Sequence, residues 1–297
     1  MKLYIALLAA VLSIQLTSCS SGANPGNSQS PSSQNQSTIV NTGSDTMVNL
    51  ALAWAEQYQT KNPDVSISVS GGGSGTGIAS LINGTSDLAN ASRKMKAEEY
   101  DQAAQNGQEP VEFIVARDAI AIIVNPSNPI DQLSLQQVSD IYSGIYNNWS
   151  ELGGEDRPIV RVSRETNSGT HVYFLEQVLR MGEKGNKTLF SPDTLLLPSS
   201  QGITSEVRDN PNAIGYDGLG YVIPEVKVIA VSKGGQGPYI LPSVDSVNDS
   251  LYPIARDLYI YSAGQPDADI QEYLDWIISP EGQTIVKDNG FVPISAQ

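Results

Sequence analysis

Three short stretches rich in glycine, serine and threonine carry the clearest chemistry in this sequence. They are "GSDT" (Gly43–Thr46), "SGGGSGTG" (Ser70–Gly77) and "SRETNSGT" (Ser163–Thr170). Such loops expose backbone N–H groups because glycine has no side chain to cover them, and the hydroxyls add further donors. A group of donors of this kind favours an anion. The glycine loop taken alone is equally typical of a flexible linker, so its neighbours must decide between the two interpretations.

Each of these loops follows a strand-like run and precedes a helical pattern. The strands are expected at Thr38–Asn41, over the alternating residues Val65 to Val69, and at Ile159–Val162. After each loop the apolar residues recur at helical spacing: Met47, Leu50, Ala51, Trp54 and Tyr58; then Ile78, Leu81 and Ile82; then Val172, Leu175, Val178 and Leu179. The sequence therefore predicts the same strand–loop–helix unit three times.

A helix that starts at such a loop can bind an anion. Its first N–H groups are unpaired, and its dipole places roughly half a positive charge there. Ser44 or Thr46 is suited to cap the first of the three helices. Because ligands of open α/β sheets lie beyond the carboxyl ends of the strands, we expect the three helix starts to converge on one tetrahedral oxyanion.

Two arginines occur where this arrangement needs a positive charge. Arg164 lies four residues before Ser168, and Arg93 ends the run "DLANASR" (Asp87–Arg93) that follows the second helix. A guanidinium can bind two oxygens of one oxyanion, and each such charge-assisted hydrogen bond contributes about 1.5–3 kcal/mol. Either arginine alone is better explained by a surface salt bridge. Together with three polar helix starts, the pair favours an anion site.

The chain as a whole is strongly acidic, with a formal net charge of −15 over 297 residues. No basic patch is visible in the sequence, which argues against nucleic acid as a partner. Affinity for an anion must therefore come from local dipoles and arginines, while the acidic exterior governs solubility and long-range steering. One cysteine and one histidine make a structural zinc site implausible, and no other metal-ligand spacing occurs.

Three enzyme motifs can be tested against these residues, and none fits. A P-loop needs lysine after its last glycine, but Gly77 is followed by Ile78. A nucleophile elbow needs glycine two residues after its serine, but Thr76 stands two residues after Ser74. His171, the only histidine, falls just inside the third helix, where a surface or packing role is expected. The residues indicate binding rather than catalysis.

The N-terminus predicts export and lipid attachment. Lys2 is followed by the apolar run Leu3–Leu16, which is short for a membrane span and typical of a signal peptide over residues 1–18. The ending "LTSC" resembles the lipobox of bacterial lipoproteins, and its cysteine, Cys19, would be acylated after cleavage. A plain signal peptide with an incidental cysteine is the alternative. Residues 19–37 are rich in Ser, Asn, Gln, Pro and Gly and predict a disordered tether.

These motifs resemble those of a known family, the phosphate-binding proteins of bacterial ABC phosphate importers (the PstS type). The resemblance runs from about residue 38 to residue 297. Its most specific element is an arginine followed after three residues by Ser-Gly-Thr, here Arg164 and Ser168–Thr170. Other matching stretches are the first two loops, "DLANASR", "DIYSGIYNNWSEL" (Asp140–Leu152) and "NAIGYDGLGYV" (Asn212–Val222).

The resemblance implies an α/β, two-lobed periplasmic-binding-protein fold of type II, with two crossover strands. Lobe I would comprise residues 38–115 plus 229–297, and lobe II residues 116–228. The apolar run Phe113–Asn125 would form the first crossover, and Lys227–Ser232 would form the return. Residues Ile270–Ile294 would be a helix pair that packs on lobe I.

The resemblance also implies a set of phosphate ligands. Thr46 and Met47 would give backbone N–H groups at the first helix, assisted by the hydroxyl of Ser44 or Thr46, and Ser74 would give its hydroxyl and N–H. The other lobe would contribute Arg164, Ser168, Gly169 and Thr170.

Arg93 departs from the more common pattern of this family. Many members carry an aspartate at this place to accept the proton of bound phosphate, and Arg93 resembles a subgroup without it. A second arginine is expected to bind phosphate and to favour its dianion, so that affinity should rise from about pH 6 to about pH 8. The basis for distinguishing phosphate from sulfate is then left open.

The function that the sequence indicates is that of a periplasmic or cell-surface lipoprotein, attached to a membrane only through its lipid. It would bind inorganic phosphate between its lobes as a monomer and deliver it to the membrane subunits of an ABC permease. Two alternatives stay open: the same fold binding sulfate or molybdate, and a secreted phosphatase that uses the same anion seat. No cofactor, metal or catalytic residue is expected.

Overall fold

A computed structural model describes residues 37–294, which lie within one compact unit, Gln36–Gln297. The predicted signal peptide, Cys19 and almost all of the predicted tether lie outside the described residues. Strand β1 begins at Ser37, one residue inside the segment predicted as tether. Between residues 37 and 294, no helix is long and apolar enough to cross a membrane.

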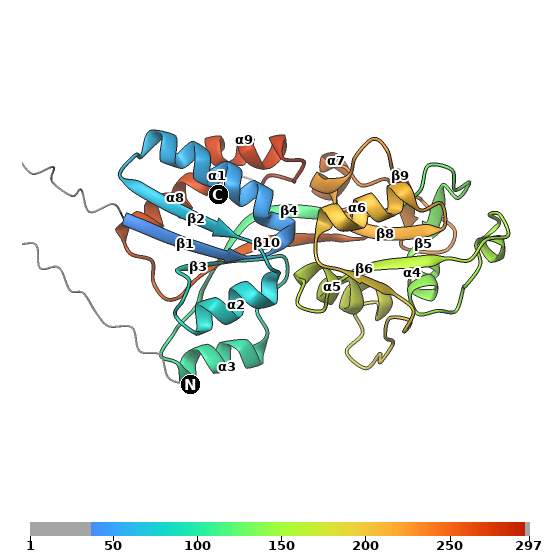
Figure 1. Cartoon of the computed structure of the whole chain (residues 1–297), viewed down its shortest axis with the longest axis horizontal. Helices are drawn as coiled ribbons and strands as arrows, with labels where there is room; N and C mark the ends of the chain where they lie inside the picture. Colours follow the sequence, from blue (N-terminus) through green and yellow to red (C-terminus); the bar gives the residue numbers. More distant parts are fainter. Residues whose placement is uncertain (1–36, 295–297) are drawn as a thin grey trace, which may run out of the picture. The chain divides into compact units, whose positions relative to one another are not determined.

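Lobe I is built on three parallel strands in the order β2–β1–β3, with helices on both sides (Figure 1). Its strands are β1 (Ser37–Gly43), β2 (Val65–Ser70) and β3 (Leu88–Ala91), and its helices are α1 (Val48–Lys61), α2 (Ser74–Ile82), α3 (Ala97–Gln105), α8 (Ala268–Ile278) and α9 (Pro280–Asp288). Helix α1 buries the face that carries Leu50, Trp54 and Tyr58. Trp54 Nε1 donates to Gly282 O at 2.9 Å, which fixes α1 against α9.

Two long antiparallel strands, β4 (Val111–Val124) and β10 (Ala255–Ser262), connect the lobes (Figure 1). Strand β10 pairs with β3 of lobe I, and β4 pairs with β8 of lobe II. The order β2-β1-β3-β10-β4-β8-β6-β7 therefore runs through both lobes. These pairings confirm the predicted α/β fold with two lobes and two crossover strands.

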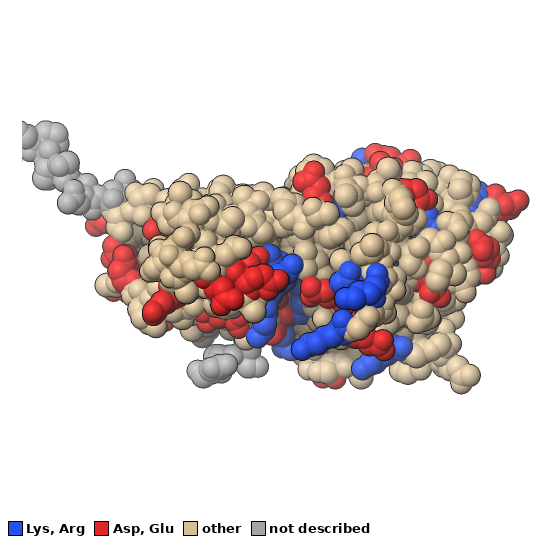
Figure 2. Space-filling view, turned by 90° about the horizontal axis from the view of Figure 1, so that it is seen from below, with Lys and Arg blue, Asp and Glu red and all other residues tan. Residues whose placement is uncertain are grey.

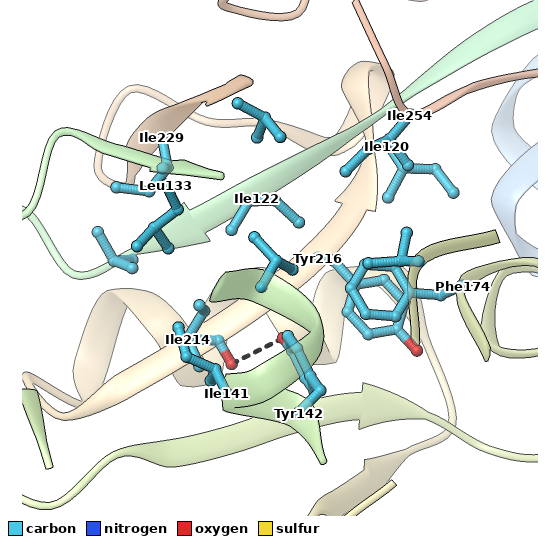
Figure 3. Packing of buried hydrophobic residues seen from close by; sticks show 14 of the residues in the cluster. Ile120, Ile122, Leu133, Ile141, Tyr142, Phe174, Ile214, Tyr216, Ile229 and Ile254 are labelled. Atoms are coloured by element: carbon cyan, nitrogen blue, oxygen red, sulfur yellow. Dashed lines mark hydrogen bonds between the residues drawn. The ribbon is translucent and has the colours of Figure 1, made fainter. Parts of the chain in front are cut away.

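Lobe II has mainly parallel strands and its own aromatic core. Its strands are β5 (Gln132–Ser134), β6 (Val160–Arg164), β7 (Leu195–Leu197), β8 (Ala213–Gly218) and β9 (Lys227–Ser232), and its helices are α4 (Leu135–Tyr142), α5 (Gly169–Phe174), α6 (Ser200–Asp209) and α7 (Val244–Asn248). The rings of Phe174 and Tyr216 stack with centroids 3.6 Å apart, and Tyr142 OH donates to Ile214 O at 3.2 Å (Figure 3). This packing fixes α4, α5 and β8 around the end of β6.

The structure differs from the expected lobe boundaries at the return crossover. Strand β9, expected to return to lobe I, pairs with β5 and with the lobe II end of β4. Residues Val247 and Ile254 also belong to the core of lobe II. The second crossing is made by β10, so residues 229–254 pack with lobe II. The helix pair α8–α9 packs on lobe I through Leu274 and Val286, as expected.

Candidate functional site

The first loop enters α1 through a 3-10 turn, η1 (Asp45–Met47). Ser44 and the two residues Thr46 and Met47 are buried. The Met47 N–H donates to Ser44 O at 3.0 Å, and the Ser44 N–H donates to Asn90 O at 2.9 Å. The Ser44 hydroxyl makes no capping hydrogen bond. The N–H of Met47 is thus part of the turn itself, and its role as a ligand stays a prediction.

The loop between β2 and α2 is rich in glycine and has no large side chains because lobe II lies directly against it. The Gly75 N–H donates to Asn167 O at 2.9 Å, and Asn167 Nδ2 donates to Gly72 O at 2.8 Å. Gly73 has φ +100°, and a Cβ at this position would lie 2.9 Å from Asn167 O. Only glycine suits both the backbone angle and this close approach. The loop is a contact between lobes, and the linker interpretation does not apply.

The third loop connects β6 to α5, and Ser168 caps the helix. Ser168 Oγ accepts from the N–H groups of Thr170, at 3.2 Å, and His171, at 3.5 Å. The ring of His171 stacks on Phe190, and its Nδ1 lies 3.0 Å from Ser163 Oγ. Burial lowers the pKa of His171 below its ordinary value. His171 therefore has the packing role that its position in the sequence suggested.

The three loops meet at the junction of the lobes. Thr46 Oγ1 lies 2.7 Å from Thr170 Oγ1, a hydrogen bond between residues 124 positions apart. A Cβ at Gly169 would lie only 2.3 Å from Ser74 Oγ and 2.6 Å from Ser92 Oγ. Four of the predicted ligands, Thr46, Ser74, Gly169 and Thr170, are thus brought together by the structure, two from each lobe.

Arg164 is almost completely buried at the end of β6 and contacts both lobes. Its Nη1 lies 3.1 Å from Asp45 Oδ2 of lobe I and donates to Ser200 Oγ at 2.8 Å. Its Nη2 donates to Pro198 O at 2.8 Å. Among the described residues, Nε has no hydrogen-bond partner although it is buried. Because a buried N–H is seldom left unpaired, this donor is available to a ligand.

Arg93 is held by its own lobe. Its Nη1 and Nη2 donate to Glu99 at 2.8 and 2.7 Å, and Nη1 also donates to Lys94 O at 2.9 Å. Burial raises the pKa of Glu99, but the hydrogen bonds from Arg93 and from the Lys96 N–H outweigh it and hold the pKa below its ordinary value. The side-chain hydrogen bonds of Arg93 go to Lys94 and Glu99, and its buried Nε, like that of Arg164, has no partner among the described residues. Its role as a phosphate ligand stays a prediction.

A third arginine, Arg256, contacts the third loop, and no motif in the sequence had singled it out. Its Nη2 donates to Thr170 Oγ1 at 2.9 Å, and its Nη1 donates to Ser92 O at 2.8 Å. Asp118 of β4 accepts from the same guanidinium at 2.8 Å. The sequence did contain one signal for Arg256. It stands two residues before Leu258 in an alternating apolar strand, so its side chain lies on the same buried face as that of Leu258.

A fully buried carboxyl group, that of Asp217, is linked to Arg164 through the hydroxyl of Ser200. Its Oδ1 accepts from Ser200 Oγ at 2.9 Å and from the Gly218 N–H at 2.8 Å. In the described part of the chain its Oδ2 has no partner. Burial raises the pKa of Asp217 to about 7, although the Arg164 guanidinium and these two hydrogen bonds oppose the rise.

The raised pKa of Asp217 predicts a pH-dependent stability. The folded pKa lies above the unfolded value of about 3.9, so folding is favoured by protonation, and this contribution is lost as pH rises toward 7. We expect Asp217→Asn to remove that loss. The free energy of unfolding of the variant, relative to wild type, should rise by on the order of 2 kcal/mol between about pH 5 and about pH 8. Urea unfolding of both proteins at the two pH values measures this difference, and a constant difference would contradict the prediction.

Lysine and arginine side chains gather near the middle of one face of the protein, with acidic side chains beside them (Figure 2). One hollow is lined by Arg93, Lys94, Lys96 and Arg256, and a neighbouring hollow that shares Glu176 with it is lined by Arg180 and Lys184. The sequence showed no basic patch because three separate segments form this one. Positive charge near Arg256 favours the approach of an anion to an otherwise acidic protein.

The lobes, the crossing strands and the polar contact between helix starts define a solute-binding protein of the periplasmic-binding type. A family model described as PBP superfamily domain matches residues 28–281. The phosphate-binding protein PstS of Pseudomonas aeruginosa is 31% identical over 276 residues, 87% of this chain and 84% of the relative. PstS of Bacillus subtilis is 30% identical over 299 residues, 99% of this chain and 94% of the relative.

A solved structure gives the same result. A putative phosphate ABC transporter substrate-binding protein with bound phosphate, from Clostridium perfringens, is 33% identical, with a TM-score of 0.77 over 87% of this chain and 100% of that one. The chain belongs to the PBP superfamily and, within it, to the family of PstS phosphate-binding proteins. This membership confirms the prediction of a binding protein rather than an enzyme. Within residues 37–294, no group of three His, Cys, Asp or Glu side chains could hold a metal ion.

Proposed function

We propose that this protein is an extracytoplasmic, lipid-anchored receptor that binds inorganic phosphate between its lobes and delivers it to the membrane subunits of an ABC permease. Its ligands would be the donors of the three loops, contributed by Ser44, Thr46, Met47, Ser74, Ser168, Gly169 and Thr170, together with Arg164. Arg93 would join this set through its buried Nε, which has no partner among the described residues, or through its Nη atoms if their contact with Glu99 breaks.

One observation carries the proposal: hydroxyl donors from opposite lobes meet at helix starts, with Thr46 Oγ1 and Thr170 Oγ1 2.7 Å apart. A small anion seated there would be held by both lobes at once, which couples binding to closure of the lobes. Exclusion of water strengthens each hydrogen bond to the anion. The unpaired Nε of Arg164 adds a charged donor beside the same loops.

Calorimetry of the ligand-stripped protein tests the proposal. We expect one phosphate to bind per molecule, with sulfate and molybdate at least about tenfold weaker, a difference of about 1.4 kcal/mol. If sulfate or molybdate binds more tightly than phosphate, the protein is a receptor for that oxyanion with the same fold. Steady release of phosphate from a phosphate ester would instead favour a phosphatase.

The lipid anchor has its own test. Cys19 ends the lipobox-like "LTSC", and its thiol is the group that would be acylated. We expect Cys19→Ser to give soluble protein or an uncleaved precursor, because a hydroxyl does not replace the thiol in this modification. Membrane fractionation with mass spectrometry of the mature N-terminus measures the outcome. Correct processing with unchanged membrane attachment would contradict the prediction, and Ser18→Ala serves as the neighbouring control.

A further inference from the structure

Arg256 joins both lobes through a single guanidinium. It lies on the crossing strand β10, and its side chain is 2% exposed. It donates to Ser92 O of lobe I and to Thr170 Oγ1 of lobe II, at 2.8 and 2.9 Å. Asp118, on the other crossing strand, accepts from its Nη2 at 2.8 Å and from its Nε at 3.2 Å. Asp118 is completely buried, and besides the guanidinium it accepts from the Leu219 N–H of lobe II at 3.2 Å.

The contact with Thr170 fixes the direction of a hydroxyl. A guanidinium can only donate, so Thr170 Oγ1 is the acceptor in this hydrogen bond. The single proton of the Thr170 hydroxyl must then point elsewhere, either to Thr46 Oγ1 at 2.7 Å or to an anion that lies between the lobes. Donation by a cation also polarises the O–H group and makes it a stronger donor.

The guanidinium is also anchored to lobe I through Ser92. Arg256 Nη1 donates to the carbonyl of Ser92, and the Ser92 N–H donates to Ser74 Oγ at 3.0 Å. Ser74 Oγ also lies 3.2 Å from Ser92 Oγ, and either hydroxyl can be the donor in that contact. The contact with Ser92 therefore fixes Arg256 against lobe I, whereas the hydroxyl whose direction it sets is that of Thr170.

We propose that Arg256, held in place by Asp118, is a positioning residue for anion binding: it orients the Thr170 hydroxyl as a donor to the anion. This inference rests on the proposed function, because it takes phosphate as the ligand. Arg256 need not touch phosphate itself. A purely structural ion pair would stabilise the fold but would not act through Thr170.

A double-mutant cycle separates these two roles. Phosphate affinity is measured by calorimetry for wild type, Arg256→Gln, Thr170→Val and the double variant, with circular dichroism as a check on folding. We expect Arg256→Gln to weaken binding about 10- to 100-fold, the loss of a hydrogen bond from a charged donor. In the Thr170→Val background, the same change should weaken binding by no more than about threefold.

Two further variants complete the test. Arg117→Gln removes a positive charge next to Asp118 on β4, where Arg117 donates to Asn248 Oδ1. It should leave phosphate affinity within about twofold of wild type. If Arg256→Gln does not fold, Arg256→Lys keeps the charge beside Asp118, and its smaller effect should also vanish in the Thr170→Val background.

The outcomes are distinct. If wild type does not bind phosphate, the proposed function fails. If wild type binds but Arg256→Gln stays within twofold, or weakens binding equally with and without the Thr170 hydroxyl, the positioning role is overturned.

Discussion

Gly169→Ala should weaken phosphate binding at least about 100-fold while leaving the protein folded. A Cβ at this position would lie 2.3 Å from Ser74 Oγ and 2.9 Å from Ser74 Cβ, across the junction of the lobes. The methyl group cannot be accommodated by a rotation of the serine hydroxyl alone, so the lobes would have to separate. Separation moves the donors of opposite lobes apart, and a loss of about 2.7 kcal/mol corresponds to the 100-fold change.

The stability of Gly169→Ala and a control variant separate a loss of binding from a loss of folding. Alanine is a good helix former, so the free energy of unfolding should change by less than about 1 kcal/mol, because the clash is relieved by opening rather than by unfolding. Gly185 has no atom within 4 Å of a Cβ placed on it, and Gly185→Ala should bind phosphate as wild type does. Calorimetry gives the affinities, and small-angle scattering with and without phosphate reports closure. An affinity of Gly169→Ala within about threefold of wild type would show that the lobes do not close on this contact.

The meeting of the three loops was predictable because it depends on local patterns. A strand-like run ended at each loop, and apolar residues at helical spacing followed it. Parallel strands bring their carboxyl ends to one edge, so Thr46 and Ser74, each following a strand of lobe I, had to lie near one another. The resemblance of Arg164, Gly169 and Thr170 to the PstS-type motif then indicated the partner loop of lobe II.

The partners of the arginines were harder to predict because they depend on contacts between distant segments. Arg256 lies 86 residues from Thr170 and 138 residues from Asp118, and no local pattern selects these partners. Arg93 has a local partner instead, Glu99. That residue stands at the third position of α3, where a carboxylate that accepts backbone N–H groups is favoured, and this signal was available in the sequence.

The position of the return crossover could not be read from the sequence for a similar reason. Both β9 and β10 are runs of alternating or apolar residues, and either could cross between lobes. The choice depends on register: β9 pairs at Ile229 with Ile122 of β4, whereas β10 follows β4 along most of its length. Strand pairing of this kind is set by packing over many residues rather than by local propensity.

Arg164→Lys should weaken phosphate binding about 10- to 100-fold although the positive charge is kept. The guanidinium contacts Asp45, Ser200 and Pro198 through its two Nη atoms, which leaves the buried Nε without a partner in the described part of the chain. A lysine ammonium is a single point donor and cannot hold these acceptors while also donating to an anion. The loss of one charge-assisted hydrogen bond, about 1.5–3 kcal/mol, gives the expected range.

The control for this variant is Arg208→Lys, since Arg208 pairs with Asp209 on the surface of α6 and contacts none of the three loops. Its affinity for phosphate should equal that of wild type. The lysine at position 164 should still be drawn to Asp45 and Ser200, so the fold should be kept and the effect should appear in binding. If calorimetry instead finds Arg164→Lys within about twofold of wild type, a difference of only ~0.4 kcal/mol, the anion does not use the guanidinium geometry and Arg164 serves only to hold Asp45 to lobe II.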